Sequence, residues 1–448
     1  MPASPSTARA INDRLALRLL QQEGPLTAGQ LKQLTGLSRP SVADLVERLA
    51  AAGLIDVVGE SGEQRRGPNA KLYGIVADQA HLAALDVRTE GVSVVVSDLL
   101  GGVLAEASVP IGGDTGTGPA VEQAVALVER AAKEAGVPEL HTVGIGAPGL
   151  IDPATGELRD SGGLPAWHRR LVLALQERLP RTRVHVENET NLAALAEQRE
   201  GVARDRDTFV LLWLGHGTGA AVVLEGTLRR GASGGTGEIG FLPVPGTAGL
   251  PSAVDCEGGF HSLAGSAAIV ALAERHGLTV EARGYEPPAA SVVREAVASA
   301  AAGAATAAGA VTTAVTGAAT GAVAGAATGA VAGAATDFLD ALADRLAVGV
   351  AAVVAILDPG CLVLAGEVGQ AGGADLAARV ERRVRRMSPL PTEVRVSALG
   401  GGAVLRGALL TARERAQDEL FAPLQGRGAP PGHAAPPRGR DQLPPARR

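Results

Sequence analysis

The residues from Glu187 to Asn191 form a short polar cluster between two apolar stretches. Before it, Val184 and Val186 alternate with polar residues as in a strand, and after it residues 192–196 have the composition of a helix. Carboxylates and amides at such a junction can hold sugar hydroxyls, because Asn both donates and accepts and Glu accepts two hydrogen bonds. The same residues also suit an ordinary helix N-terminus, where they cap free N–H groups. Taken alone, the cluster therefore favours capping.

Three glycine-rich loops lie on either side of this cluster in the sequence. The first, residues 146–152, follows an apolar strand at 141–145, and the second, residues 215–219, follows another at 208–214. The third spans 231–240 and contains Glu238. Ligands of α/β sheets bind at the carboxyl ends of strands, where such loops begin. The spacing therefore predicts a ligand site assembled from several loops.

The elements that would position these loops form two α/β blocks between residues 81 and 421. Apolar alternation predicts strands, a period of 3.6 predicts helices, and the two kinds of pattern recur in both blocks. We therefore expect two lobes. The predicted strands are 82–86, 91–98, 102–109, 141–145, 208–214, 220–224 and 361–369, and the predicted helices include 121–135 and 337–357.

Residues 1–80 are predicted to form a winged helix-turn-helix. Helices are expected at 10–22, 28–35 and 38–52, with a turn at Gly36 between the last two. Two strands, 56–58 and 71–75, enclose a glycine-rich wing. The buried side chains expected on the second and third helices are Leu31, Leu34, Val42, Leu45, Val46 and Leu49.

This module carries residue types that suit DNA. The first residues of the third helix, which meet base edges in such motifs, include hydroxyls and an arginine, and the wing carries further cations that suit phosphates. The alternative is a three-helix module for protein interaction, but two adjacent arginines on a glycine-rich wing offer nothing apolar to pack. The predicted DNA-binding residues are Ser38, Arg39, Ser41, Arg65, Arg66 and Lys71.

The composition sets further bounds. A chain of 448 residues is too long for one core, so two or three domains are expected. The net charge of −6 argues against wholesale coating of nucleic acid, and the two cysteines give neither a disulfide framework nor metal-ligand spacing. No uniform apolar run is long enough for a membrane span, and we expect a cytoplasmic protein.

Taken in order, the motifs resemble those of the ROK family of sugar kinases and sugar-responsive repressors. The matching segments are GIGAPGLID at 144–152, VENETNLAALAE at 186–197, GTG at 217–219 and GTGEIG at 235–240. The resemblance implies an α/β fold in which an N-terminal winged helix-turn-helix precedes a two-lobed, actin-like ATPase domain. It also implies sugar contacts from Asn188, Glu189, Glu238 and His261.

The chain departs from the family where kinases handle phosphate. The family's Asp-x-Gly-Gly-Thr loop is replaced by residues 86–90, Asp-Val-Arg-Thr-Glu, so side chains crowd the space that glycines leave for phosphate. Glu189 stands in the place of the family's catalytic Asp, and the longer side chain displaces the carboxylate. We therefore expect no catalytic residue, no phosphorylation of sugar and no cofactor.

The family's zinc ligands are also replaced. Phe241 stands at the histidine position, and Ser252, Val254 and Gly259 stand at the cysteine positions, while Cys256 falls between them. No tetrahedral thiolate site can be built from these residues, so no metal is expected. Trp167 could either stack on a sugar face or fill the core.

Two segments have a biased composition. Residues 299–336 are almost wholly Ala, Gly, Val and Thr, and we expect an inserted mobile segment between two core helices, because Gly disfavours helix. Residues 422–448, rich in Pro, Gly and Arg, are expected to be a disordered tail. The expected domains are thus 1–80, 81–421 and this tail.

These observations favour a sugar-responsive DNA-binding regulator, a repressor of carbohydrate genes. Its expected partners are operator DNA and a sugar or sugar phosphate effector, and we expect a homodimer or homotetramer because one winged helix reads only a half-site. One alternative is an ATP-dependent sugar kinase that retains a DNA-binding module. Another is a DNA-binding protein whose sugar lobes serve only as a dimerisation scaffold.

Overall fold

The protein, described here from a computed structural model, divides into two compact units. The first comprises residues 1–76 and 417–448, and the second comprises residues 77–416. The structure describes residues 5–61, 70–159, 165–252, 257–281, 286–314 and 322–421, with the side chains of 5–7 and 307–328 left out. The predictions for Arg65, Arg66, Val254, Cys256 and the tail 422–448 lie outside the described residues.

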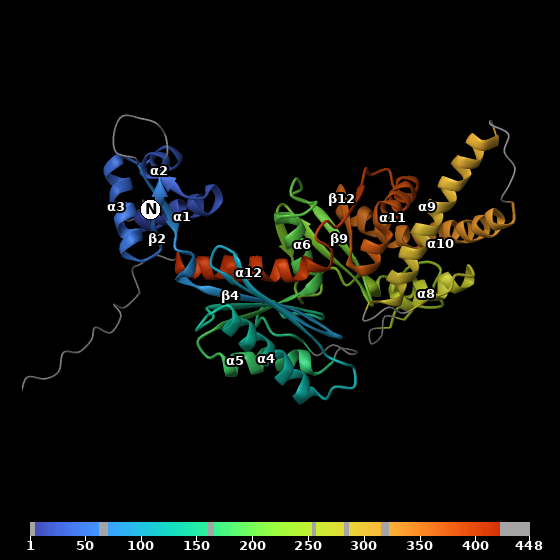
Figure 1. Ribbon diagram of the computed structural model, residues 1–448, viewed down its shortest axis with the longest axis horizontal. Helices are drawn as coiled ribbons and strands as arrows, with labels where there is room; N and C mark the ends of the chain where they lie inside the picture. Colours follow the sequence, from blue (N-terminus) through green and yellow to red (C-terminus); the bar gives the residue numbers. More distant parts are fainter. Residues whose placement is uncertain are drawn as a thin grey trace, which may run out of the picture. The chain divides into compact units, whose positions relative to one another are not determined.

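The first unit has three helices and an antiparallel sheet with strand order β1-β3-β2 (Figure 1). Its second helix is held by a capping box, in which Thr27 and Gln30 satisfy each other's backbone N–H groups. Gly36 then turns the chain in the left-handed region, and Ser38 caps the third helix. The elements are α1 Pro5–Glu23, β1 Leu26–Thr27, α2 Ala28–Thr35, α3 Arg39–Ala51, β2 Ile55–Glu60 and β3 Lys71–Ile75.

The predicted winged helix-turn-helix is confirmed, with one error in its core. The four apolar side chains expected inside α3 are buried, and so is Leu31 on α2. Leu34 was expected to be buried too, but 49% of it is exposed. It lies in the last turn of the eight-residue helix α2, next to the turn at Gly36. The first helix also begins at Pro5, ahead of the predicted Ala10.

The first lobe of the second unit is a sheet of order β6-β5-β4-β7-β8, in which β4, β7 and β8 are parallel. Helices α4 and α5 cover one face, and α12 lies on the other (Figure 1). This arrangement brings the carboxyl ends of β4, β7 and β8 to one edge of the sheet. The elements are η1 Ala77–Gln79, β4 His81–Arg88, β5 Gly91–Asp98, β6 Val103–Pro110, α4 Thr117–Glu134, β7 Thr142–Ala147, α5 Trp167–Arg178, β8 Arg183–Asn188 and α6 Glu189–Arg199.

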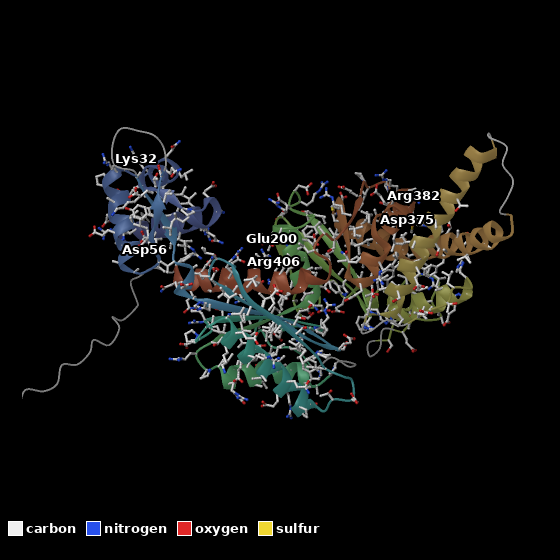
Figure 2. All side chains as sticks on the ribbon, in the orientation of Figure 1. Lys32, Asp56, Glu200, Asp375, Arg382 and Arg406 are labelled. Carbon is white, nitrogen blue, oxygen red and sulfur yellow. The ribbon has the colours of Figure 1, made fainter. Side chains whose placement is uncertain are left out.

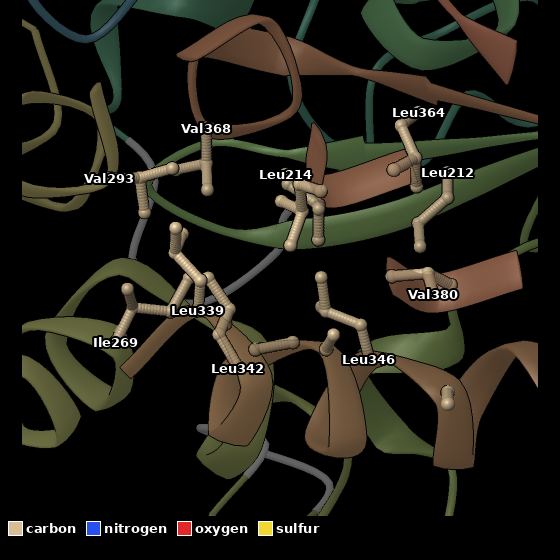
Figure 3. Packing of buried hydrophobic residues seen from close by; sticks show 14 of the residues in the cluster. Leu212, Leu214, Ile269, Val293, Leu339, Leu342, Leu346, Leu364, Val368 and Val380 are labelled. Atoms are coloured by element: carbon tan, nitrogen blue, oxygen red, sulfur yellow. The ribbon is translucent and has the colours of Figure 1, made fainter. Parts of the chain in front are cut away.

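The second lobe is a sheet of order β11-β10-β9-β12-β13 with helices packed against it. Leu212, Leu214 and Leu364 of the strands face Leu339 and Leu346 of α10 in one apolar core (Figure 3). The elements are β9 Phe209–Leu214, β10 Thr218–Leu224, β11 Thr227–Arg229, η2 Ile239–Phe241, α7 His261–Ala264, α8 Ser266–Arg275, α9 Pro288–Ala314, α10 Ala322–Leu357, β12 Cys361–Ala365, α11 Gly366–Met387, β13 Glu393–Val396 and η3 Gly400–Gly402. The chain then returns to the first lobe with α12 Ala403–Leu420.

The expectation that glycine disfavours helix at 299–336 is wrong for the residues that the structure describes, while the mobility expected of this insert stays a prediction. Residues 299–314 continue α9, and residues 322–336 form the start of α10. Alanine is the best helix former, and here it outweighs the glycines. Gly303 also lets the two helices approach closely, because a Cβ there would overlap Ala332. Among the described helices, these long ones included, none has the length and hydropathy that crossing a bilayer requires.

Helix α12 packs closely against the elements that carry the polar cluster of residues 187–191. Its Gly407 lies against the backbone of Leu192 on α6, where a Cβ would overlap the Leu192 carbonyl oxygen. Arg406 donates to Glu200 just beyond the end of α6, with one nitrogen-to-oxygen distance of 3.0 Å (Figure 2). The close packing of α12 on α6 therefore requires a glycine at position 407.

We expect Gly407→Ala to destabilise the protein by about 1–3 kcal/mol, because the added methyl group overpacks the α6–α12 contact. The measurement is the midpoint of thermal or urea unfolding of the second unit's transition. Gly333→Ala, in an exposed part of α10 with open space around it, is the matched control and should be neutral or stabilising. Equal effects of the two substitutions would contradict the close contact.

Candidate functional site

Asn188 is the N-cap of α6 and holds the junction between β8 and that helix. Its side-chain oxygen accepts from the backbone of Thr190 at 2.9 Å and of Asn191 at 3.2 Å. Its amide nitrogen donates to the Gly149 carbonyl oxygen at 3.1 Å and to Glu189 at 2.9 Å. The capping interpretation is thus confirmed. The same side chain also ties the glycine-rich loop at 146–152 to Glu189.

Glu187, immediately before Asn188, is buried and connects a second loop to the junction. It accepts from the amide of Asn191 at 2.9 Å and from Arg230, which follows β11, at 2.7 Å. An ion pair whose carboxylate is buried and hydrogen-bonded holds its geometry tightly. The pair therefore holds the loop that begins at Gly231, and with it Glu238, against the β8–α6 junction.

Glu189 and Glu238 both have carboxyl groups whose ionisation burial disfavours. Burial raises the pKa of Glu189 to about 8, and Asp86 and Glu238 add to the effect through repulsion. Burial of its carboxyl group also raises the pKa of Glu238, although much of that residue's surface stays exposed. At neutral pH, Glu189 is therefore protonated in a large share of molecules and can donate a hydrogen bond.

His261 lies at the start of α7, which packs beside the η2 turn that follows Glu238. Burial lowers the pKa of this histidine, so its neutral form is favoured. The fold thus places all four residues of the predicted sugar set in neighbouring elements. Direct contact is seen between Asn188 and Glu189.

Trp167 fills the core of the first lobe. It is 4% exposed and packs edge to face on His168, with ring centroids 4.3 Å apart. Burial also lowers the pKa of His168 to about 4. Of the two roles considered for Trp167, the structure shows core packing.

A cavity of about 630 Å³ opens between the two lobes, within the size range of small-molecule sites. One wall consists of β4 and β5 with the turn between them, and the other includes Trp213 and Glu367 of the second lobe. Among the described residues that line it, Glu189 comes from the predicted sugar set. The cavity therefore extends from Glu189 toward the loop that handles phosphate in kinases.

Arg88 fills the phosphate end of this cavity. Its Nε donates to both carboxylate oxygens of Asp86, at 3.0 and 3.2 Å, and a terminal nitrogen pairs with Glu367 across the cleft. The guanidinium also lies over the Trp213 ring, 5.4 Å from its centroid. Burial opposes the charge, but Asp86 and Glu367 nonetheless raise the pKa of Arg88 above its usual value. A permanent cation therefore occupies this part of the cleft.

Glu90 makes a second contact with the other lobe. Its carboxylate lies 3.0 Å from Nε2 of His216, in the loop between β9 and β10. Although burial opposes it, hydrogen bonds with His216 and Thr89 lower the pKa of Glu90 to about 2. A carboxylate at this position repels phosphate oxygens, as the sequence led us to expect. Its partner His216 was not anticipated.

Sequence reasoning missed Glu367, Trp213 and His216 as parts of the cleft. Arg88 and Glu367 are 279 positions apart, and no local pattern connects them. The one usable indication was the position of each residue at the end of an apolar strand, where α/β sheets bind ligands.

The described part of the predicted DNA surface lies on the first unit. Ser38, Arg39 and Ser41 are exposed at the N-terminus of α3, and Lys71 is exposed at the start of β3. The Ser38 hydroxyl accepts from the backbone of Ser41 at 3.3 Å, so it serves as a cap. Arg39 is therefore the long side chain available to reach outward from the start of this helix.

The zinc site implied by the family resemblance does not fit this chain. Phe241 replaces the histidine, and its ring offers no ligand atom. Within the described ranges, no cluster of three or more His, Cys, Asp or Glu side chains is suited to a metal ion. No step of the chemistry is therefore assigned to a metal.

Comparison with known proteins identifies the family. The ROK family model matches residues 83–415, about three-quarters of the chain. The chain belongs to the ROK family. A MarR family model matches residues 11–67, within the winged helix-turn-helix unit.

Both regulators and kinases are among the similar proteins. The chain is 28% identical over 244 residues to the N-acetylglucosamine repressor of Shigella flexneri, a match that covers 53% of this chain and 58% of that repressor. The crystal structure of a ROK family transcriptional regulator, a homologue of the E. coli MLC protein, matches with a TM-score of 0.69 and 20% identity. The match covers 92% of this chain and 98% of that regulator. A Streptomyces griseus ROK glucokinase, solved with glucose and AMPPNP, matches with a TM-score of 0.56 and 24% identity. The match covers 75% of this chain and 100% of that glucokinase.

These comparisons confirm the predicted two-lobed fold and the sugar-kinase-like architecture of the second unit. The chain spans little more than half the length of the curated repressor that it matches. The solved structures are less than 25% identical to it and show the fold alone.

The raised pKa of Glu189 predicts a loss of folding stability as the pH rises, and Glu189→Gln should remove this loss. The folded state holds the proton up to about pH 8, whereas the unfolded chain releases it near 4.5. Stability from this group is therefore complete below about pH 4.5 and is lost as the pH rises toward 8. We expect the melting temperature of Glu189→Gln, relative to the unsubstituted protein, to increase between pH 5 and pH 8.5.

Thermal unfolding across that pH range is the measurement. Glu157→Gln, which makes the same change at an exposed position, gives the reference for losing one carboxylate. A melting-temperature difference for Glu189→Gln that stays constant or shrinks with pH would contradict the buried, protonated carboxyl group.

Proposed function

We propose that the protein is a sugar-responsive transcriptional repressor that binds DNA through its first unit and a sugar through the cleft of its second. The observation that carries the proposal is Arg88, which occupies the phosphate end of a cleft whose sugar end keeps Asn188, Glu189 and Glu238. A site of this kind is equipped to hold a sugar but has lost the loop that would hold ATP.

The DNA half of the proposal rests on the exposed start of α3. Helix-turn-helix proteins insert the N-terminal residues of their second helix into the major groove, and Arg39 can donate two hydrogen bonds to guanine there. Ser41 and Lys71 would contact bases or phosphates. The same role is proposed for Arg65 and Arg66. Because one module reads a half-site, the active form would be a homodimer or homotetramer.

The sugar half of the proposal rests on the junction of β8 and α6. Glu189, when protonated, can donate to one hydroxyl, while Glu238 and neutral His261 can bind others. A hydroxyl that exchanges for the Asn188–Glu189 hydrogen bond would couple the ligand to the α6 N-terminus. Such a ligand changes DNA binding only if it binds the DNA-competent and DNA-free states unequally.

We further propose that the protein does not phosphorylate its sugar. A triphosphate would have to displace Arg88 from Asp86 and Glu367 and then lie beside Glu90. The test is a coupled assay for ADP release with ATP and a panel of hexoses and pentoses, where we expect no turnover above background. Turnover that disappears in Glu189→Gln would instead establish the protein as a kinase.

The central experiment is a band-shift titration of the DNA upstream of the protein's own gene, with and without the same sugars. We expect binding, and we expect at least one sugar to weaken it by about tenfold, within the usual range of allosteric coupling. The proposal fails if the protein binds neither that DNA nor a pool of genomic fragments.

Arg39→Ala should weaken specific DNA binding by about 1–3 kcal/mol, because a bidentate contact to guanine is lost. Arg18→Ala removes the same charge from an exposed position on α1 and is the matched control. Fluorescence anisotropy with the specific fragment and with an unrelated one separates the two outcomes. Equal losses for both variants on both fragments would mean that Arg39 contributes only general charge.

A further inference from the structure

We infer that the effector of this cleft is an uncharged sugar and that the cleft rejects the same sugar once it carries a phosphate ester. The inference rests on the proposed function, because it names the ligand class of the same site. It is carried by the pairing of the cations at the cavity wall and by the number of carboxyl groups around them.

Each nitrogen of Arg88 already has a carboxylate partner. Its Nε and one terminal nitrogen bind Asp86, with a nitrogen-to-oxygen distance of 3.0 Å for each, and its other terminal nitrogen binds Glu367. The Trp213 ring covers one face of the guanidinium. Each terminal nitrogen keeps a second N–H group, so a phosphate that bound Arg88 would lie beside Asp86 and Glu367 and against the repulsion of their carboxylates.

His216 is paired as well. Its Nε2 lies 3.0 Å from the Glu90 carboxylate, and both residues line the cavity. Arg230, near the sugar end, is bound to buried Glu187 at 2.7 Å. Arg88, His216 and Arg230, which the described residues place along this route from sugar end to phosphate end, thus each already have a carboxylate partner.

The carboxyl groups outnumber these basic side chains. The cavity is lined by Asp86, Glu90, Glu189, Glu286 and Glu367, of which Glu286 is itself paired with Arg294. Repulsion from Glu238 also reaches Glu189. Burial already raises the pKa of Asp86, Glu189 and Glu238, which shows that further negative charge is unfavourable here. A phosphate ester carries a charge between about −1.5 and −2 at neutral pH and would add to this repulsion.

An unphosphorylated sugar suits the same wall. Sugar hydroxyls donate hydrogen bonds to carboxylates without adding charge, and a partly protonated Glu189 can donate one in return. The cavity has room for such a ligand without moving Arg88.

The test is isothermal titration of the full-length protein at pH 7.5 with matched pairs: glucose and glucose 6-phosphate, N-acetylglucosamine and its 6-phosphate, mannose and its 6-phosphate. We expect at least one neutral sugar to bind and its phosphate to bind at least about tenfold more weakly. A phosphate that binds as tightly as its parent sugar, or more tightly, overturns the inference.

Glu367→Gln tests the cause. It removes one of the two carboxylates that hold Arg88, so the affinity for the phosphorylated member should increase relative to the neutral one. Asp375→Asn makes the same kind of change on the same helix, at an ion pair with Arg379 outside the cavity lining, and should leave the ratio unchanged (Figure 2). An unchanged ratio in Glu367→Gln, with normal thermal unfolding, counts against the paired-cation explanation.

The two proposals fail in different ways. If DNA binding is intact but no sugar of either kind binds, both the sugar-responsive function and this inference are wrong. If a sugar phosphate binds best and releases DNA, the proposed function holds and only the inference about charge is wrong. The wild-type comparison decides between these outcomes even if Glu367→Gln does not fold.

Discussion

The ion pairs of Arg88 determine what the cleft between the lobes can hold. Arg88 ends β4 in the first lobe, binds Asp86 on its own strand, and reaches Glu367 of α11 and Trp213 of β9 in the second. A buried cation needs partners, because desolvation without them costs several kcal/mol. The carboxylates are therefore committed to the arginine. A loop that in kinases leaves space for phosphate has become a bridge between two sheets.

The junction of β8 and α6 depends on one residue that makes several hydrogen bonds. Asn188 caps the helix through its oxygen and uses its nitrogen to hold Gly149 and Glu189. The pair of Glu187 with Arg230 fixes the next loop against the same point. Because the Asn188 side chain makes a hydrogen bond to each of them, the α6 N-terminus, the loop at Gly149 and Glu189 are held at one point.

Helix α12 adds further contacts to α6, beyond its junction with β8. Gly407 allows α12 to lie directly on the backbone of α6, and Arg406 pairs with Glu200. Close packing transmits displacement, because interiors have little free volume. Helices α9 and α10 pack in the same way. Gly303 has no side chain and Ala332 has a small one, so the two backbones approach closely there. In both places small residues set the distance between helices.

The sequence by itself determined the two kinds of unit, the order of their elements and the identity of the junction residues, because caps, periodicity and glycine-rich turns are local. It also predicted impaired phosphate binding, from the residue types at Arg88 and Glu90. It misjudged Leu34 and the alanine-rich helices, where neighbouring elements decide burial and length. Only the tertiary structure decided that Arg88 meets Glu367, because their contact joins distant segments through sheet topology.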